Sequence, residues 1–451
     1  METQPAKTSS LTAVATRPRW VLLDWLGHRE DHAYADDATV ASCHTSTGKD
    51  IQVSFRFAAP PAISRLYLRW PGGPSKESSS FAYPRVIAAH GDSVLLQLTD
   101  PPSRIDYFVY KASGAGPPSL TLLPQFAHNA EDRSRWGRYT GSATDQRKRM
   151  VDRKAIGFLR RGSDDAFAVA ELSTTGGDGT RVAFELCVLC NAWKLGRVQI
   201  RDAKGFQLPA LKRWETDAVV PVGGRTLGWV DYYRGVLLGH VFELDEWSSA
   251  LTYVPLPVHT PRAKPDHGQE CPEASRSVGV VNAGDGDKVR FVSVDRGLLF
   301  VFTLTVWTLN DAPDGGMEWE KDGEFRAADL WAFSGYEHLP HVPPEYPVVS
   351  MDDPDGLFFL VSEGRHAGVC AGADNTVWLV EVDTRRRAVR SVTRYSKEET
   401  RRKSRRAVRD DDDDDLDSIS SMFHGHAFLP SEVSMYASRS DDPGAGRTSD
   451  K

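Results

Sequence analysis

Short runs of β-type residues, each ended by Gly, Pro, Asp or Ser, recur along this chain and constrain its fold more than any other feature. Residues 225–257 read as three such runs, "RTLGWVDYY", "VLLGHVFEL" and "LTYVPLP", with turns between them. Strand periodicity places Trp229 and Asp231 on one face and Val230 and Tyr232 on the other, so both faces carry bulky residues. This pattern predicts a three-stranded meander covered on both sides, with its aromatic side chains in the core.

The same pattern of strand, turn and strand recurs elsewhere, and helical periodicity is almost absent. Hairpins are predicted from 93–98 with 106–112 and from 181–190 with 197–202. Recurring meanders in a long all-β chain favour radial repetition, because a propeller limits exposed sheet edges. We therefore predict an all-β fold over residues 16–396, a β-propeller-like array of antiparallel meander blades, six or seven in number. Two packed β-sandwiches are the alternative, because the one kelch-like Gly-Gly pair, Gly223-Gly224, has no regular repeat.

Charge and composition exclude several classes of protein. The net charge of −7 matches the seven aspartates between Asp410 and Asp417, so the remaining chain is near neutral, unlike a globally basic nucleic-acid binder. No secretory leader and no run of about 18 apolar residues is present, which argues against secretion and membrane insertion. Five scattered cysteines do not form a disulfide framework. The expected location is cytoplasmic, nuclear or both.

The two ends of the chain differ in composition from the body. Residues 1–15 are predicted to be a disordered leader, and residues 397–451, with few apolar side chains, a disordered and charge-segregated tail. A basic block in that tail has the composition of a nuclear-import or nucleic-acid patch; its residues include Arg401, Arg402, Lys403, Arg405 and Arg406. The adjoining aspartates are able to neutralise it.

Motifs for catalysis are missing, and the polar clusters fit structural roles. Cys187 and Cys190 lie three residues apart in a predicted strand, so their thiols diverge, and Pro340 between His338 and His341 prevents a helical metal pair. The aspartate-rich stretches 282–288, 310–316 and 351–356 read as hairpin turns, residues 145–154 as a solvated basic loop, and 424–426 as at most a weak metal binder. We predict no catalytic, cofactor or metal site.

Several segments, among them "FAYPRVIAAHGDSVLLQL" and "LGWVDYYRGVLLGHVFELDEWSSALTYVPLP", resemble the plant family called domain of unknown function 1618. The signature region is about 228–365, and its most distinctive residues, for which we predict a structural role, are Gly228, Trp229, Asp231, Arg234, Gly235, Pro255 and Pro257. The resemblance implies a propeller-like fold akin to the domains that follow F-boxes. It transfers no catalytic residues, and no F-box of its own is evident near the N-terminus.

The expected function is therefore that of a non-enzymatic protein-interaction scaffold or adaptor, which binds unknown protein partners through its propeller loops and not nucleic acid or a membrane. One alternative is an enzyme whose side chains converge in the propeller channel from several blades. Another is a nuclear, nucleic-acid-associated protein that acts through the basic tail.

Overall fold

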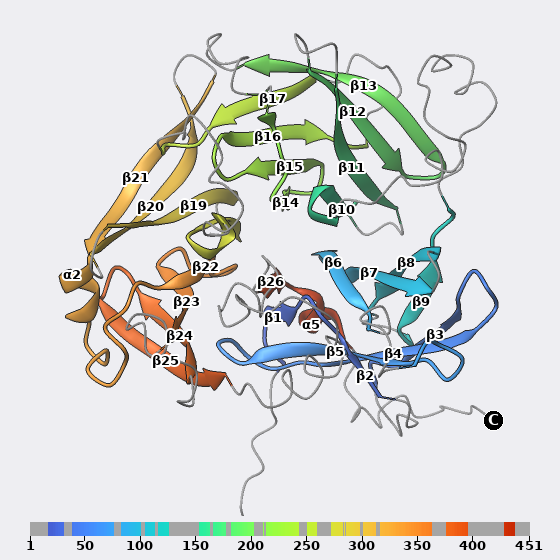
Figure 1. The fold of residues 1–451 in the computed structure, drawn as a ribbon, viewed down its shortest axis with the longest axis horizontal. Coiled ribbons are helices and arrows are strands. Elements are labelled where there is room, and N and C mark those ends of the chain that lie inside the picture. Colours follow the sequence, from blue (N-terminus) through green and yellow to red (C-terminus); the bar gives the residue numbers. More distant parts are fainter. Residues whose placement is uncertain are drawn as a thin grey trace, which may run out of the picture.

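In the computed structural model, the described residues form six β-sheet blades around a central channel (Figure 1). The structure describes residues 17–30, 38–75, 83–100, 104–112, 116–125, 153–162, 166–176, 182–202, 211, 213–242, 250–258, 272–282, 284, 286–297, 301–312, 316–362, 376–395 and 428–437.

Five blades are four-stranded antiparallel meanders in which the chain runs outward from the channel. Blade 2 contains β6 (Arg85–His90), β7 (Ser93–Asp100), β8 (Arg104–Lys111) and β9 (Ser119–Leu122). Blade 3 contains β10 (Ile156–Arg160), β11 (Phe167–Gly176), β12 (Val182–Leu189) and β13 (Trp193–Asp202). Blade 4 contains β14 (Ala218–Val222), β15 (Thr226–Asp231), β16 (Gly235–His240) and β17 (Ala250–Pro255). Blade 5 contains β18 (Arg276–Asn282), β19 (Asp287–Arg296), β20 (Phe302–Asp311) and β21 (Met317–Arg326). Blade 6 contains β22 (Glu345–Val349), β23 (Gly356–Ser362), β24 (Val377–Asp383) and β25 (Ala388–Tyr395).

Blade 1 departs from this plan because it combines both ends of the described chain. Its strand order is β26 (Phe428–Ser431), β1 (Val21–Asp24), β5 (Ile63–Arg69), β4 (Asp50–Arg56) and β3 (Ala41–His44), and β2 (His28–Arg29) also pairs with β5. The innermost strand β26 is antiparallel to β1, whereas β1 is parallel to β5. Short helical segments complete the described structure: η3 (Arg153–Ala155), η5 (Pro272–Ala274), α2 (Ala327–Trp331) and α5 (Val433–Tyr436).

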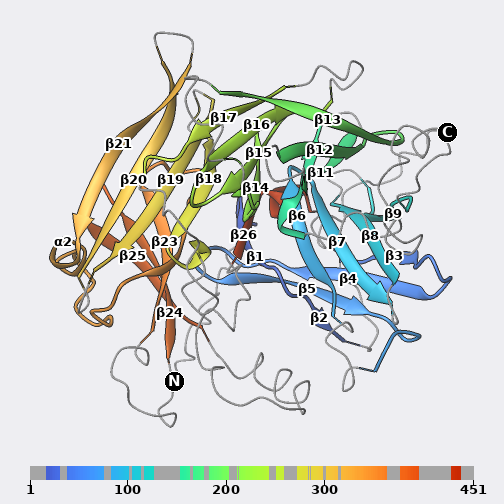
Figure 2. The ribbon, with the colours of Figure 1, turned by 45° about the horizontal axis from the view of Figure 1, so that its top comes forward.

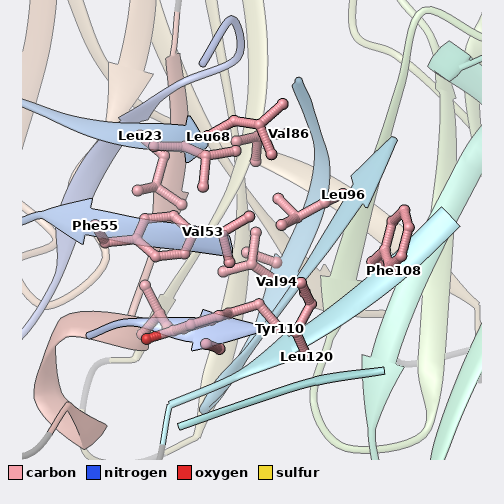
Figure 3. Close-up of a cluster of buried hydrophobic side chains, with 14 of the residues drawn as sticks. Leu23, Val53, Phe55, Leu68, Val86, Val94, Leu96, Phe108, Tyr110 and Leu120 are labelled. Atoms are coloured by element: carbon pink, nitrogen blue, oxygen red, sulfur yellow. The ribbon is translucent and has the colours of Figure 1, made fainter. Parts of the chain in front are cut away.

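Each pair of neighbouring blades shares a hydrophobic core, so the described residues form six cores between blades. Figure 3 shows the core between blades 1 and 2, where Val53 and Phe55 from β4 face Val94 and Leu96 from β7. Blades 3 and 4 are also joined at their outer edges, because β13 pairs in parallel with β17. A sheet packed between two cores buries both its faces, which explains the two-sided hydrophobic strands in the sequence.

The all-β, propeller-like fold predicted from the sequence is confirmed, and of the six or seven predicted blades the described residues form six. The predicted hairpins are present as β7–β8 and β12–β13, and the predicted meander as β15–β16–β17. Both views show one ring of blades, so the alternative of two packed sandwiches does not describe this chain (Figures 1 and 2). Among the described residues, no helix is long and apolar enough to cross a membrane.

The prediction of a disordered tail over residues 397–451 needs correction for residues 428–437. These residues form β26 and α5, and β26 supplies the innermost strand of blade 1 (Figure 1). Val433 is fully buried in the core between blades 1 and 2, and the hydroxyl of Ser434 donates to the carbonyl of Pro18 at 2.8 Å. Pairing with the distant N-terminal strand supplies order that the local composition does not indicate. The predicted leader, the basic block and the rest of the tail lie outside the described residues.

We expect a chain that ends at residue 427 to lose much of its stability, because the removal of β26 and α5 exposes one edge of β1 and opens two cores. Thermal unfolding followed by circular dichroism should show a melting temperature lower by roughly 10 °C or more. A chain that ends at residue 437 keeps both elements and serves as the control. Equal melting temperatures for the two chains would contradict closure of the ring by β26.

Candidate functional site

The turn between β15 and β16 is held by a buried ion pair from the family signature. Asp231 and Arg234 are almost completely buried, and Nη1 of Arg234 donates to Oδ2 of Asp231 at 2.8 Å. The same carboxylate accepts hydrogen bonds from the backbone N–H groups of Glu215 and Tyr233, both at 3.0 Å. Burial raises the pKa of Asp231 to about 6, and the charge of Arg234 limits the rise. The pair therefore fixes the backbone of this turn.

Other signature residues also lie where packing is tight. Trp229 is fully buried in the core between blades 3 and 4, and its Nε1 donates to the carbonyl of Ala155 at 3.0 Å. A side chain at Gly235 would collide with the carbonyl oxygen of Val254. At Gly228 a Cβ would come within 3.1 to 3.3 Å of three neighbouring side chains. Pro255 ends β17 and accepts a hydrogen bond from Trp319, while Pro257 lies just beyond the strand.

A second buried carboxylate, Asp217, supports the same turn from the start of β14. Its Oδ2 accepts a hydrogen bond from the backbone N–H of Tyr232 at 2.8 Å. Burial, together with the negative charge of Glu273 nearby, raises the pKa of Asp217 to about 8. Glu273 is itself buried and forms an ion pair with Lys154, which comes from η3 in front of β10. Three blades thus contribute charged groups to one small region.

Arg276, at the start of β18, connects blade 5 to this region. Its Nη1 donates to the carbonyl of Tyr232 at 2.6 Å, and its guanidinium lies 5.5 Å from the ring centroid of Tyr233. Asp295 is the nearest carboxylate with a recorded ion pair, at 3.9 Å. Burial lowers the pKa of Arg276. The signature turn therefore also anchors the inner strand of the next blade.

The central channel contains a cavity of about 270 Å³ that runs between inner strands of several blades. Glu273 and Arg276 line one end of it, and His90, Asp287 and Glu432 line the other. Between them lie apolar residues of the inner strands, such as Val219 from β14, Val280 from β18 and Val349 from β22. The seven residues of β18 give the channel a length of about 20 Å. This cavity is the candidate functional site.

The end of the cavity near His90 is formed by turns that follow the inner strands. Nδ1 of His90 accepts a hydrogen bond from the backbone N–H of Arg160 at 3.0 Å, so the neutral ring carries its proton on Nε2. Burial lowers the pKa of His90, and Asp287 opposes this effect. Burial and the charge of Asp287 both raise the pKa of Glu432. We call the group of His90, Asp287 and Glu432 the acidic mouth.

The acidic mouth is open because the turns around it contain glycines with little around them. Gly91, Gly223, Gly284 and Gly286 have positive φ angles, which suit glycine in tight turns. A Cβ at Gly91, Gly284 or Gly286 would meet no atom within 4 Å. At Gly223 it would meet only Oδ2 of Asp287, at 3.7 Å. A partner therefore has access to the backbone of these turns.

Among the polar clusters considered from the sequence, the stretch 282–288 reaches the channel, because Asn282 and Asp287 line the cavity, whereas the described cysteines and histidines of those clusters do not line it. Cys187 is buried, whereas Cys190 lies just past the end of β12 and its thiol is 3.8 Å from the carbonyl oxygen of Val241. His341 stacks on Trp331 with ring centroids 4.9 Å apart, on the loop before β22. In the stretch 351–356, Asp353 accepts the backbone N–H of Gly356 and pairs with Arg390. Residues 424–426 lie outside the described residues, as does most of the loop 145–154.

Within the described part of the chain, no group of three His, Cys, Asp or Glu side chains is placed to hold a metal ion. The predicted absence of metals and cofactors remains a prediction, as does the structural role of the signature residues. What the geometry provides is an elongated cavity with an apolar middle, carboxylates at both ends and a guanidinium at one.

A family model matches a central part of the sequence, from blade 4 to the second strand of blade 6. Residues 229–358 match the family described as "Protein of unknown function (DUF1618)". The resemblance to this family noted from the sequence is thereby confirmed over these residues. The DUF1618 match includes the signature turn, Arg276 and Asp287, but not His90 or Glu432.

Other comparisons add little to the DUF1618 match. None of the curated proteins matches this sequence. A similar solved structure is "Crystal structure of AofleA from Arthrobotrys oligospora", with 11% sequence identity and a TM-score of 0.33. The alignment covers 84% of this chain and 87% of that chain. A likeness at this TM-score supports no argument about function.

Sequence reasoning did not identify the cavity, and it considered the stretch 282–288, which contains Asp287, only as a hairpin turn. His90, Glu273, Asp287 and Glu432 come from four different blades or connections and form no local motif. One signal was available: a glycine follows the inner strand in each of blades 2 to 5, as Gly91, Gly162, Gly223 and Gly284. Residues beside those glycines were candidates for the channel mouth.

We expect Trp229→Ala to lower the free energy of unfolding by about 3–5 kcal/mol, because it leaves a cavity between blades 3 and 4. Urea unfolding monitored by circular dichroism measures the change. Trp229→Phe keeps a ring in the core and loses the hydrogen bond to Ala155, so its effect should be smaller. Wild-type stability of the alanine variant would contradict the core position of this side chain.

The raised pKa of Asp217 predicts a stability that depends on pH. Because the folded-state pKa is about 8 and the ordinary value is 3.8, this carboxyl favours folding below pH 4 and the benefit is lost as pH rises through 8. The urea midpoint of the wild type should therefore fall between pH 5.5 and 8.5. Asp217→Asn keeps an acceptor for Tyr232 but does not ionise, so its midpoint should fall less. An equal fall in both proteins would show that Asp217 is not responsible.

Proposed function

We propose that this protein is a non-enzymatic adaptor that binds a protein partner at the acidic mouth of its propeller channel. The observation that carries the proposal is the open ring of turns over an elongated cavity, with carboxylates at the rim. Propeller-like folds place variable turns around a channel on a rigid frame, which suits recognition. We further propose that this binding takes place in the cytoplasm, the nucleus or both.

The charge of the acidic mouth supports a partner with basic side chains. Neither Asp287 nor Glu432 forms an ion pair with a described residue, and Asp287 is exposed. Carboxylates at the rim of a low-dielectric channel concentrate the field there and attract cations. A lysine or arginine of the partner that enters the cavity would find these two carboxylates first. The neutral His90 beside them adds no opposing charge.

The outer surface offers less support for binding through apolar contacts. Among the described residues, the exposed large hydrophobic side chains are Val301, Val392 and Met435. They belong to different blades or segments, and scattered apolar residues of this kind are common on protein surfaces. Polar recognition at the channel is therefore better supported than an apolar docking patch.

An enzyme that uses the channel is the second candidate. It is supported by the raised pKa of Asp217, since a carboxyl that stays protonated near neutral pH is able to act as a general acid. Against it, Glu273 is engaged by Lys154, and Asp217 holds the backbone of Tyr232. Hydrolysis of a chromogenic ester, phosphate or glycoside by the wild type, abolished in Glu273→Gln, would favour the enzyme over the adaptor.

Affinity purification from cells that express the protein, followed by mass spectrometry, tests the adaptor proposal. We expect the double variant Asp287→Asn/Glu432→Gln to lose most of the partners recovered with the wild type, because it removes both carboxylates of the rim while conserving shape. The control variant Asp50→Asn/Glu318→Gln removes the same charge from the outer strands β4 and β21. Identical partner sets for all three proteins would contradict recognition at the acidic mouth.

A further inference from the structure

The outermost hairpin of blade 6 carries an unusual density of arginines. Arg385, Arg386 and Arg387 form the exposed turn between β24 and β25, and Arg390 and Arg394 lie exposed on β25. Val392, between the last two, is 39% exposed. We call these five arginines, with Val392, the arginine face. It lies on the outer edge of the propeller, away from the channel (Figure 1).

Most of the ion pairs within the arginine face are formed by one residue, Arg390. Arg390 pairs with Asp353 and with Asp383, and lies 3.7 Å from Glu381. Arg386 reaches only Asp383, at 3.7 Å, and its side chain is 81% exposed. The same carboxylate thus serves two guanidinium groups. The local negative charge is largely used by Arg390.

The other three arginines form no ion pair with any described residue. Arg387 lies over the ring of Phe325 at 5.9 Å, and Arg394 donates to the hydroxyl of Thr376 at 3.1 Å. Arg385 has no recorded side-chain partner within the described part of the chain. These three groups are therefore available to an anionic partner.

The edge of β25 is also available over most of its length. Among the described residues, its free side is bridged only at its start, where Ser334 pairs with Ala388. From Arg390 onward β24 is its one described neighbour. An open strand edge accepts an added extended segment through backbone hydrogen bonds, while side chains select its chemistry. The chemistry selected here is that of an extended acidic segment.

We propose that the run Asp410–Asp417 of this same chain docks on the arginine face. Seven of its eight residues are aspartates, which complements the unpaired arginines. The run begins 15 residues after Tyr395, where β25 ends, so the connecting chain reaches up to roughly 50 Å. The eight residues of β25 span only about 25 Å. The whole arginine face is therefore within reach.

The positions of Tyr395 and Phe428, where the chain leaves the fold and returns to it, also support this docking. Residues 396–427 leave blade 6 at Tyr395 and re-enter the fold at Phe428, and the two ring centroids are only 6.4 Å apart. The connection therefore begins and ends at one place, beside the arginine face. Tethering at both ends gives a segment an effective concentration in the millimolar range. Weak individual ion pairs are sufficient under that condition.

The basic block at Arg401–Arg409 is the competing site for the aspartates. It adjoins them directly in "AVRDDDD", and antiparallel pairing of the two blocks would need a tight turn at their junction. That junction has aspartates but no glycine, and the two-residue hairpin turns that pair strands most closely favour glycine after Asn or Asp. The arginine face instead lies on a folded strand, so its side chains lose less conformational freedom on binding. Docking there leaves the basic block available for other contacts.

Hydrogen exchange of the full chain, measured by mass spectrometry, tests this docking. At about 20 mM salt we expect amide exchange in residues 410–417 to be about fivefold or more slower than at about 500 mM, where charges are screened within a few ångströms. The triple variant Arg385→Gln/Arg387→Gln/Arg394→Gln should abolish the slowing. The matched control Arg401→Gln/Arg402→Gln/Arg406→Gln removes the same charge from the basic block and should keep it.

Two results would overturn the docking. One is the absence of salt-dependent slowing in the wild-type chain. The other is slowing that survives in the arginine-face variant and disappears in the basic-block variant, since the aspartates would then pair with their sequence neighbours. A melting temperature equal to the wild type verifies that the triple variant is folded. This outcome does not depend on the channel, so the adaptor proposal is tested separately.

Discussion

Every blade of this protein must bury both faces of its sheet, and the rest of the structure depends on that requirement. The six cores lie between blades rather than within them, so no blade has a complete core of its own. Trp229 and Val230 are consecutive on β15, yet they belong to different cores. A closed ring satisfies the requirement because each face meets a neighbour, whereas an open array would leave two faces in water.

Closure explains why the chain returns to its beginning. The N-terminal strand β1 needs an inner neighbour, and β26 supplies it from more than 400 residues further along. The core between blades 6 and 1 brings Trp20 together with Phe358 from β23, so two ends of the described chain and blade 6 stabilise one another. A change at either end is therefore transmitted to the ring.

The sequence predicts the strands well because strands buried on both faces are runs of consecutive hydrophobic residues. In β15 and β23 nearly every residue is apolar or small, and both strands are almost fully buried. The blade repeat was harder to find, although Gly91, Gly162, Gly223 and Gly284 each follow an inner strand. These glycines are 71, 61 and 61 residues apart (162−91, 223−162 and 284−223). The interval is nearly regular, but it is longer than the roughly 40 to 50 residues of common propeller repeats, so a search at those periods does not find it.

Two features could not be predicted from the residues around them in the sequence. Phe428–Ser431 is a four-residue strand that pairs with Val21–Asp24, and the short apolar stretch that contains it is flanked in the sequence by long segments rich in charged and small polar residues. The cavity residues His90, Glu273 and Glu432 have ordinary neighbours in the sequence and acquire their environment only when the ring closes. Contacts of such long range are decided by the closed ring, which a local pattern does not encode.

The same constraint decides where chemistry is possible in this molecule. Side chains between blades pack in the hydrophobic cores. The charged groups buried there are paired, as in the ion pair of Asp231 with Arg234, which holds the turn. Charges without such partners include those at the rim of the channel and at the outer edge of blade 6. The rim is acidic and the edge is basic, so the two surfaces attract opposite charges. Because β25 is the outermost strand of blade 6 and the rim surrounds the channel, docking of Asp410–Asp417 on the arginine face, as proposed, leaves the acidic mouth accessible.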